Sequence, residues 1–333
     1  MKTSNPKKVL VVGTGSIGLR HIANLKDLGC SVGVFSCSDR GVKGLGDVDC
    51  ERGSIKQVIN RYDAVVIANA TNKHLEIARA CVDENIPFYI EKPLSHDFFG
   101  VAELEELITK KGILTKVGYM MRAHPNLVFI NDYLKNTNKR IFFVSASVGQ
   151  WLGDWRPNRD YRDCYSSFSE QGGGVIYELI HEIDIACWLF GEFEELFCFK
   201  NKVSDLEINT EDFAQIILKS KKGFTVDIKM DYLKAVYKRD LEIVMDGASL
   251  VWDYVAGTVK LFDNSNPKGL IVHEVCSDFN RNSMFLELMA TFLAELQEDN
   301  HAQNNTNFSE GAYSMLLAVK AHESAKFKKW VNV

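Results

Sequence analysis

Several features that would assign the chain to a special class of protein are missing. No two of its eight cysteines form a C-x-x-C pair, so neither a zinc site nor a disulfide framework is indicated. No run of five or more basic residues occurs and the formal net charge is −5, which argues against a nucleic-acid-binding surface. No apolar stretch approaches the roughly 18 residues that a membrane span needs. We therefore expect reduced thiols, no bound metal, and neither nucleic acid nor membrane as a partner.

The overall composition is that of an ordinary globular protein. The chain has 333 residues, of which 46% are hydrophobic and 25% charged, and this length is enough for a large core and two domains. Residues 1–8 are polar and contain no apolar signal region, so we expect a cytoplasmic location.

A glycine-rich motif lies between a predicted strand and a predicted helix. Residues 7–12 form an aliphatic run, typical of a strand buried on both faces of a parallel sheet. Gly13-Thr14-Gly15-Ser16-Ile17-Gly18 follows, and a helical apolar pattern then ends at Gly29. The first glycine permits a tight turn, the second lets the backbone approach a pyrophosphate, and the third allows close helix packing. The motif predicts a dinucleotide-binding Rossmann domain; a glycine-rich turn without a ligand is the alternative.

The rest of the first 120 residues continues this pattern. We predict strands over 31–35, 62–68, 86–90 and 113–117, helices over 55–60 and 98–110, a loop over 41–52, and a polar turn over 69–74 that opens a helix. In such folds the ligand lies at the carboxyl ends of the strands. The residues expected to contact the cofactor are Gly13, Gly15, Ser16, Ile17, Gly18, Ser36, Arg40, Asn69, Ala70, Thr71, His74, Glu91 and Lys92.

The residue that ends the second strand normally decides between the two nicotinamide cofactors. An acidic side chain there binds the ribose 2′-hydroxyl of NAD, whereas a small residue with a nearby arginine accommodates the 2′-phosphate of NADP. Ser36 with Arg40 favours NADP, but Asp39 could reach back if the turn is tight. The preference for NADP is therefore weak.

From residue 121 onward the pattern changes to short strands joined by turns. We predict a helix over 125–134, a strand at a sheet edge over 141–148, a loop over 151–168, and one helix from Gly172 to Phe190. Strands over 196–200, 212–219, 224–232, 240–245, 249–253, 258–262 and 270–275 follow, then two closing helices over 280–298 and 309–328. The short connections indicate an antiparallel sheet.

Hydride exchange between a nicotinamide and a secondary alcohol also needs a group that moves the alcohol proton. Cysteine and histidine ligands for a catalytic zinc are not evident, and no Tyr-x-x-x-Lys pair occurs, which leaves lysine and histidine. Lys92 ends a predicted strand, where a solvated lysine is the alternative. His181 shares one face of a predicted helix with Glu178 and Asp184, so a carboxylate could orient or charge the imidazole. A surface row of salt bridges is the alternative there.

Taken together, the motifs resemble the Gfo/Idh/MocA family of oxidoreductases. The resemblance rests on GTGSIGLRH, EKPLS, VGYMMRAHP, the GGG…HEID segment and the last helix, in this order, and it covers nearly the whole chain. It implies an α/β protein with an N-terminal Rossmann domain, residues 1–120, and a C-terminal α/β domain with a large open, mainly antiparallel sheet, residues 121–333. The last helix is expected to pack back on the Rossmann domain. NAD(P)-dependent chemistry on a sugar, cyclitol or sugar derivative is implied, as are homodimers or homotetramers.

The resemblance also implies roles for two residues. Lys92, in the E-K-P motif, is expected to contact the cofactor and the substrate hydroxyl, and His181 to act as the acid or base. Two positions depart from the family pattern. Tyr177 stands where an aspartate commonly precedes the histidine by four residues, so Glu178 is a substitute or the third catalytic member is absent. Asn69-Ala70 replaces the usual Thr-Pro.

An aromatic and basic cluster precedes the glycine run: Trp151, Trp155, Arg156, Arg159, Tyr161, Arg162 and Tyr165. Aromatic rings stack on sugar faces, and arginines pair with carboxylates or phosphates. A packed lid or subunit contact is the alternative. The residues expected to bind substrate are Arg122, Trp155, Arg156, Tyr161, Arg162 and Asp184. We favour an anionic or nucleotide sugar of surface-glycan synthesis; an inositol dehydrogenase, an NAD-assisted glycosidase and a cofactor-sensing regulator are the alternatives.

Overall fold

The computed structural model describes residues 6–36, 45–156, 159–297 and 307–333, and the chain divides into two compact units. Unit 1 comprises Met1–Met120 and Asn280–Ala312, and unit 2 comprises Met121–Phe279 and Tyr313–Val333. The first change of unit follows residue 120, where the sequence pattern changes. Residues 280–312 return to unit 1, and the last helix begins in unit 1 and continues in unit 2.

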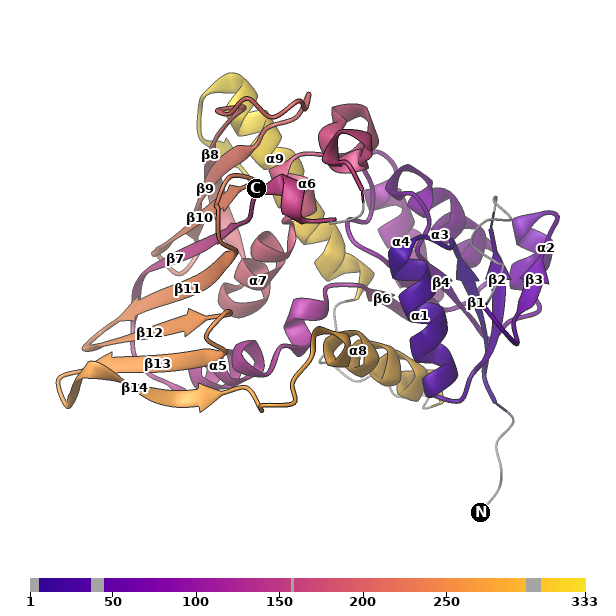
Figure 1. Ribbon diagram of the computed structural model, residues 1–333, viewed down its shortest axis with the longest axis horizontal. Helices are drawn as coiled ribbons and strands as arrows, with labels where there is room; N and C mark the ends of the chain where they lie inside the picture. Colours follow the sequence, from indigo (N-terminus) through magenta and orange to yellow (C-terminus); the bar gives the residue numbers. More distant parts are fainter. Residues whose placement is uncertain (1–5, 37–44, 157–158, 298–306) are drawn as a thin grey trace, which may run out of the picture. The chain divides into compact units, whose positions relative to one another are not determined.

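Unit 1 is built on a parallel sheet. Its strands are β1 (Lys8–Val12), β2 (Ser31–Phe35), β3 (Asp49–Glu51), β4 (Ala64–Ile67), β5 (Phe88–Ile90) and β6 (Thr115–Val117). They lie in the order β3-β2-β1-β4-β5-β6, and each neighbouring pair is parallel (Figure 1). This is the doubly wound order of a Rossmann domain, so the predicted fold of the first half is confirmed.

One strand of this sheet was missed. The predicted loop over 41–52 is wrong at β3, which pairs in parallel with β2 at the sheet edge. Two of its three residues, Asp49 and Glu51, are acidic, and the strand is mostly exposed. An edge strand of this kind has no apolar run or alternation that would reveal it.

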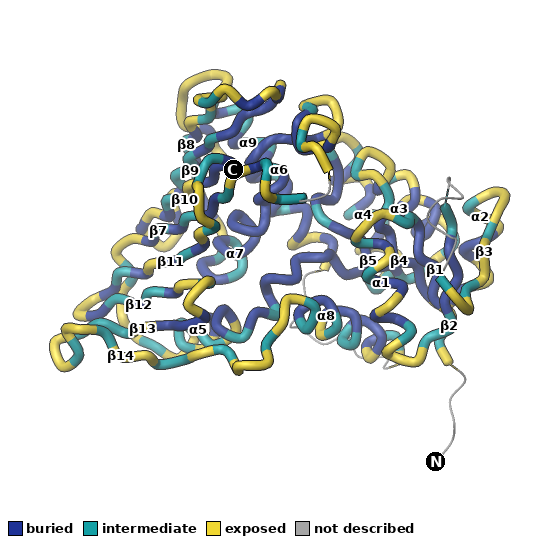
Figure 2. Tube along the Cα trace, in the orientation of Figure 1, coloured by how far each residue is buried: buried dark blue, intermediate teal, exposed yellow. Residues whose placement is uncertain are grey.

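The helices of unit 1 are α1 (Ser16–Asp27), α2 (Ile55–Ile59), α3 (His74–Asp83), α4 (Val101–Lys111) and α8 (Arg281–Glu295). The central strands β1 and β4 are largely buried, as the dark blue of Figure 2 shows. Val9, Leu10 and Val11 are fully inaccessible. These strands are continuous runs of β-branched and aliphatic residues, because helices cover both faces of a parallel sheet and bury the side chains on each face. α8 joins the unit through α1, where Arg20 Nη1 donates to Asn282 Oδ1 at 3.0 Å.

Unit 2 contains a larger, mixed sheet. Its strands in the described chain are β7 (Ile141–Gly149), β8 (Phe193–Asn201), β9 (Phe213–Ser220), β10 (Thr225–Asp231), β11 (Lys238–Met245), β12 (Ala248–Asp253), β13 (Thr258–Asp263), β14 (Asn266–Glu274) and β15 (Val331–Asn332). Their order is β14-β13-β12-β11-β7-β10-β9-β8-β15. All pairs are antiparallel except β7 with β10, so the mainly antiparallel sheet is confirmed.

The sequence misplaced β7 within this sheet. It was predicted at an edge, but it lies between β11 and β10. The misleading residues are Phe142 and Phe143, which are 47% and 45% exposed although the strand is central. Along β10, Val226, Ile228 and Met230 are buried while Thr225 and Lys229 are exposed. One side of the sheet is therefore uncovered, which exposes Phe143. Phe142 faces the other side and lies at a register shift between β7 and β11.

The helices of unit 2 are α5 (Pro125–Asn136), α6 (Val175–Glu178) and α7 (His181–Phe190), and α9 (Phe308–Phe327) continues into it from unit 1. The single helix predicted from Gly172 to Phe190 is wrong. It is two helices, separated at Leu179 and Ile180, because Leu179 has φ −99° and ψ 23°, outside the helical range. No helix in the described chain is both long enough and apolar enough to cross a membrane.

Candidate functional site

The carboxyl ends of the parallel strands in unit 1 bring the predicted cofactor residues to one edge of the sheet. Gly13 follows β1, Ser36 follows β2, Asn69 follows β4 and Glu91 follows β5. The loops are joined to one another: Gly13 N donates to Phe35 O at 2.9 Å, and the hydroxyls of Thr14 and Ser36 are 2.9 Å apart. This is the edge at which doubly wound sheets bind their ligands.

The three glycines of the motif have different surroundings. A Cβ on Gly13 would lie 2.6 Å from Ala68 O, and a Cβ on Gly18 would lie 2.1 Å from Gly13 O, so protein packing requires both glycines. A Cβ on Gly15 would meet nothing within 4 Å. Gly15 caps the amino end of α1, whose first residues Ser16 and Ile17 present main-chain N–H groups there. The open space beside Gly15 therefore fits a pyrophosphate held at a helix N-terminus.

The end of β2 carries a basic contact that the sequence did not reveal. Arg52 follows β3, and its Nη1 donates to Ser36 O at 2.7 Å. The sequence pattern does not indicate β3 or its pairing with β2. It therefore gives no signal that Arg52 lies near Ser36. Arg40 and Asp39, on which the sequence-based preference rested, lie outside the described residues.

The Glu91-Lys92-Pro93 turn follows β5. Glu91 is buried and accepts a hydrogen bond from His21 Nε2 on α1 at 2.7 Å. Lys92 is half-buried, and its peptide bond to Pro93 is cis. His74 is also buried, and its ring faces main-chain oxygens: Nδ1 lies 3.0 Å from Pro93 O, and Nε2 lies 3.2 Å from Asn69 O. Burial lowers the pKa of His74.

The second catalytic candidate lies in unit 2. His181 is the first residue of α7 and is 6% exposed, and Glu178 is the last residue of α6 and is 8% exposed. The prediction that both share one face of a single helix is wrong, because the helix breaks between them. Glu178 is hydrogen-bonded to Tyr165, and Arg156 is near both. Burial of the Tyr165 hydroxyl raises the pKa of Tyr165 well above its ordinary value, and the nearby Glu178 carboxylate raises this pKa further.

Two predicted substrate residues are paired with each other. Arg122 donates to both carboxylate oxygens of Asp184, at 3.0 Å and 2.8 Å, and the side chains are 5% and 0% exposed. The guanidinium of Arg122 also lies over the ring of Trp188, 5.8 Å from its centroid. A buried, bidentate pair of this kind anchors α7 in unit 2.

The loop before α6 is largely packed on itself. Trp155 stacks edge-on against Tyr232 with 5.0 Å between centroids. The Tyr161 hydroxyl accepts from Glu207 N at 3.3 Å. Arg162 is exposed and paired with Asp160 and Glu207. Arg156, unlike Arg162, is not exposed. Its guanidinium lies 5.1 Å from the centroid of the Tyr165 ring and close to Glu178.

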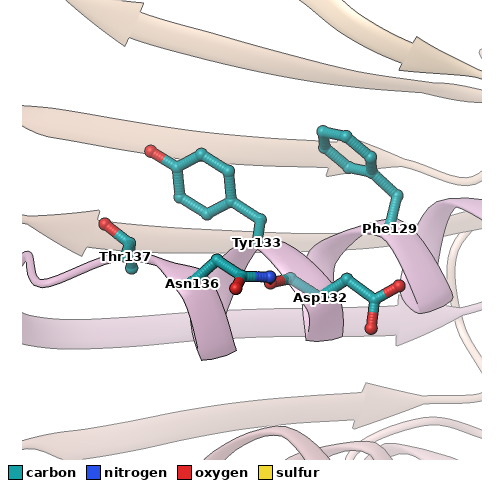
Figure 3. A pocket seen from close by; sticks show the side chains of 5 residues that line it. All are labelled: Phe129, Asp132, Tyr133, Asn136 and Thr137. Carbon is teal, nitrogen blue, oxygen red and sulfur yellow. The ribbon is translucent and has the colours of Figure 1, made fainter.

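A shallow hollow lies on a different part of unit 2. It is lined by Phe129, Asp132, Tyr133, Asn136 and Thr137, all on α5 or at its end. Figure 3 shows the rings of Phe129 and Tyr133 projecting from the same side of the helix. None of the predicted catalytic or binding residues lines this hollow.

Comparisons with known proteins support the fold and the NAD(P)-binding domain independently. Residues 140–251 match the GFO/IDH/MocA C-terminal domain, and residues 1–100 match an NAD(P)-binding domain. A myo-inositol 2-dehydrogenase from Thermotoga maritima is 24% identical over 342 residues, covering 98% of both chains.

Two solved structures have the same fold. An inositol dehydrogenase homologue from Azotobacter vinelandii, complexed with NAD+, superposes with a TM-score of 0.85 at 15% identity, covering 100% of this chain and 98% of the other. A UDP-N-acetylglucosamine 3-dehydrogenase from Acidithiobacillus ferrooxidans gives 0.80 at 16% identity, covering 97% and 99%.

The fold and the glycine loop define an NAD(P)-dependent oxidoreductase with a Rossmann domain and a second domain built on a large mixed sheet. Residues 140–251 match the C-terminal domain of the Gfo/Idh/MocA family, and the chain as a whole is similar to oxidoreductases of that family.

Proposed function

We propose that the protein oxidises a secondary hydroxyl of a sugar derivative or cyclitol, or reduces the corresponding ketone, with a bound nicotinamide cofactor. The observation that carries this proposal is the carboxyl edge of the parallel sheet, where the open Gly15 loop and the Glu91-Lys92-Pro93 turn follow β1 and β5. The cofactor, when bound, accepts or supplies the hydride. The protein supplies the cofactor cradle, the hold on the substrate oxygen and the proton transfer.

Lys92 and His181 are the residues proposed to act on the substrate. The ammonium of Lys92 would donate a hydrogen bond to the reacting oxygen and stabilise negative charge that develops on it. A neutral His181 imidazole would take the hydroxyl proton during oxidation, and its protonated form would return it during reduction. Support comes from the position of Lys92 just after β5, from the burial of His181 at the start of α7, and from the match of residues 140–251 to the Gfo/Idh/MocA C-terminal domain.

Glu178 is proposed to act through Tyr165. The hydrogen bond between Glu178 and Tyr165, with Arg156 beside both, supports a role in holding this part of the substrate domain. Glu178 would then be a positioning residue, and Tyr177 stands at the position where the family commonly has an aspartate.

Two substrate classes remain in the proposal. Arg156 favours an anionic sugar derivative, since a guanidinium beside an aromatic ring is a group that pairs with a carboxylate or phosphate. The UDP-N-acetylglucosamine 3-dehydrogenase acts on a substrate of that class. A neutral cyclitol is the second candidate. It is favoured by the myo-inositol 2-dehydrogenase that matches over 98% of the chain, and by Arg162, whose charge is already paired with Asp160 and Glu207.

For the cofactor we propose a preference for NADP. Ser36 is a small residue at the end of β2, and Arg52 reaches its carbonyl, which are the two features that accommodate a 2′-phosphate. NAD is the alternative, supported by the relative solved with NAD+.

Location and assembly are also proposed. The described cysteines are all free, which is typical of a reducing, cytoplasmic compartment. We propose self-association through the uncovered side of the unit 2 sheet, where Phe143 and Phe199 are 45% and 52% exposed. Light scattering would report a dimer or tetramer, and loss of that species in a Phe143→Lys, Phe199→Lys variant.

The function is tested by a screen that follows NAD and NADP reduction at 340 nm with inositols, neutral sugars, sugar acids and nucleotide sugars. Saturable reduction with one class identifies the substrate, and a higher kcat/KM with NADP supports the cofactor proposal. Consumption of a glycoside without net reduction would instead indicate transient oxidation during bond cleavage. No reduction in any well, with cofactor binding intact, would support a cofactor-sensing regulator.

A further inference from the structure

We propose that two buried histidines, His21 and His74, hold the Glu91-Lys92-Pro93 turn at its two ends and thereby position Lys92. His21 holds the side chain of Glu91, and His74 holds the carbonyl of Pro93. The consequence for turnover rests on the proposed role of Lys92. The structural part of the proposal, that two imidazole N–H groups fix the turn, can be tested without a substrate.

His21 connects the glycine motif to the turn. It lies on α1 with 0% exposure, and its ring meets Tyr89 and Phe285 edge-on, with centroids 5.2 Å and 6.1 Å away. A carboxylate accepts hydrogen bonds, so Nε2 donates to Glu91 Oε1 across the 2.7 Å separation. Nδ1 has no hydrogen-bond partner among the described residues. The aromatic neighbours fix the ring plane, and the single polar contact is directed at Glu91.

The carboxylate of Glu91 passes this constraint to Lys92. Its second oxygen, Oε2, accepts a hydrogen bond from the main-chain N–H of Lys92 at 3.2 Å. The carboxylate also fills the space above Gly118, where a Cβ would lie 2.8 Å from it. With Glu91 N donating to Ile67 O at 2.9 Å, the backbone that enters Lys92 is held by the sheet and by the side chain.

His74 holds the other end of the turn. It is the first residue of α3, and the loop before α3 contains Asn69, whose carbonyl faces its Nε2 at 3.2 Å. The carbonyl of Pro93 faces Nδ1 at the shorter distance of 3.0 Å. A neutral imidazole carries one N–H, and the shorter contact assigns it to Nδ1. His74 therefore donates to Pro93 O, and the backbone that leaves Lys92 is held by α3.

The alternative is that both rings only fill space in the core. Amide side chains separate the two roles, because asparagine places its N–H₂ near the position of an imidazole Nδ1 and glutamine reaches the position of Nε2. At His21 the turn contact uses Nε2, so His21→Gln keeps it and His21→Asn removes it. At His74 the contact uses Nδ1, so the order is reversed: His74→Asn keeps it and His74→Gln removes it.

The primary measurement is amide hydrogen exchange of peptides that cover residues 88–97, in the full chain without substrate. We expect His21→Asn and His74→Gln to exchange at least about tenfold faster than wild type in residues 91–95, whereas His21→Gln and His74→Asn stay close to wild type. Exchange in β1 should be alike in all four variants. Equal acceleration by both amides at each histidine, or none at all, would overturn the proposal. The Asn and Gln variants at His21 are compared with each other, and so are those at His74. If a variant of one histidine does not fold, the pair at the other histidine still tests the proposal.

Turnover is then measured on the same proteins with the substrate found by the screen, together with cofactor affinity. The two contact-removing variants should lose about tenfold to a hundredfold in kcat with cofactor Kd changed by less than about threefold, since a displaced catalytic group costs rate rather than cofactor binding. Lys92→Ala in the same series separates the two ideas. Wild-type turnover in Lys92→Ala would refute the catalytic proposal, while the exchange pattern would still decide whether the histidines hold the turn.

Discussion

Arg122 and Asp184 form a bidentate ion pair inside unit 2, with Nε and Nη2 of the arginine donating at 3.0 Å and 2.8 Å. Ser314 on α9 lies 3.2 Å from the same carboxylate through its hydroxyl. The pair therefore joins the segment after β6 and the helix α9 to α7, the helix that begins at His181. Its first effect is to fix the helix that carries the proposed acid–base residue.

Breaking this pair should destabilise unit 2. Asp184→Leu leaves the Arg122 guanidinium buried without its counter-charge, and removal of one partner of a buried pair costs about 3–5 kcal/mol. Urea unfolding measures the change in free energy. Lys56→Met is the control, because Lys56 pairs with Asp83 on the surface and its loss should cost less than about 1 kcal/mol. Equal costs in the two variants would refute the anchoring role.

Stability should fall as the pH drops from about 6.5 to about 4 because of His124. Burial, followed by the charges of Arg239 and His273, lowers the pKa of His124 to about 4. In that window the unfolded chain binds a proton that the folded chain does not, so stability is complete above the unfolded pKa and is lost toward the folded one. The loss approaches about 3 kcal/mol.

His124→Asn tests this dependence. Asparagine does not titrate and is a good N-cap residue, so it can replace the contact in which His124 Nδ1 accepts from Asn126 N. Urea unfolding at pH 7, 6, 5 and 4 should show a shallower decline in the variant than in wild type. His322, whose pKa is lowered to about 4 by burial, and His74, whose pKa burial also lowers, contribute to the slope that remains. Parallel curves would contradict the assignment to His124.

Arg52 should contribute to NADP selectivity. Its guanidinium bonds the Ser36 carbonyl at the end of β2, where a 2′-phosphate would add charge. Arg52→Ala should weaken NADP binding by about tenfold, as expected for one lost charge-assisted contact, with little change for NAD. Titration calorimetry with both cofactors measures this, with Arg40→Ala beside it. An equal loss for NAD and NADP would assign Arg52 a structural role only.

Glu178 and Tyr165 should act as a unit. If Glu178 works through its hydrogen bond to Tyr165, then Glu178→Gln and Tyr165→Phe should each lower kcat/KM. The kcat/KM of the double variant should then equal that of the less active single variant. The four proteins form a cycle that steady-state kinetics can complete. Additive losses would mean that Glu178 acts by another route, such as through His181.

The first half of the fold could be predicted well because its strands are buried on both faces. The runs over 9–12 and 64–67 contain only apolar residues, and Gly13 and Gly18 are required by packing. Where burial is one-sided or absent, the pattern weakens. β3 is polar and β7 carries exposed phenylalanines, so one was missed and the other misplaced.

The candidate site was predicted unevenly for a related reason. Sequence motifs pointed to Lys92 and His181, but a motif gives residues rather than their contacts. The partners of Glu178 depend on a helix break at Leu179, which no Gly or Pro signals. The pairing of Arg122 with Asp184 joins residues 62 positions apart. His21 was inside the GTGSIGLRH run, yet its role appears only once Glu91 is seen 2.7 Å away.

The most direct test of the account is the turnover of Lys92→Ala, His181→Ala and the double variant with the substrate found by the screen, beside Lys110→Ala as an exposed-lysine control. We predict losses of at least about a hundredfold in each single variant, cofactor affinity near wild type, and a double variant about as slow as the slower single one, because both residues serve one step. Wild-type turnover in both single variants would contradict the proposed chemistry.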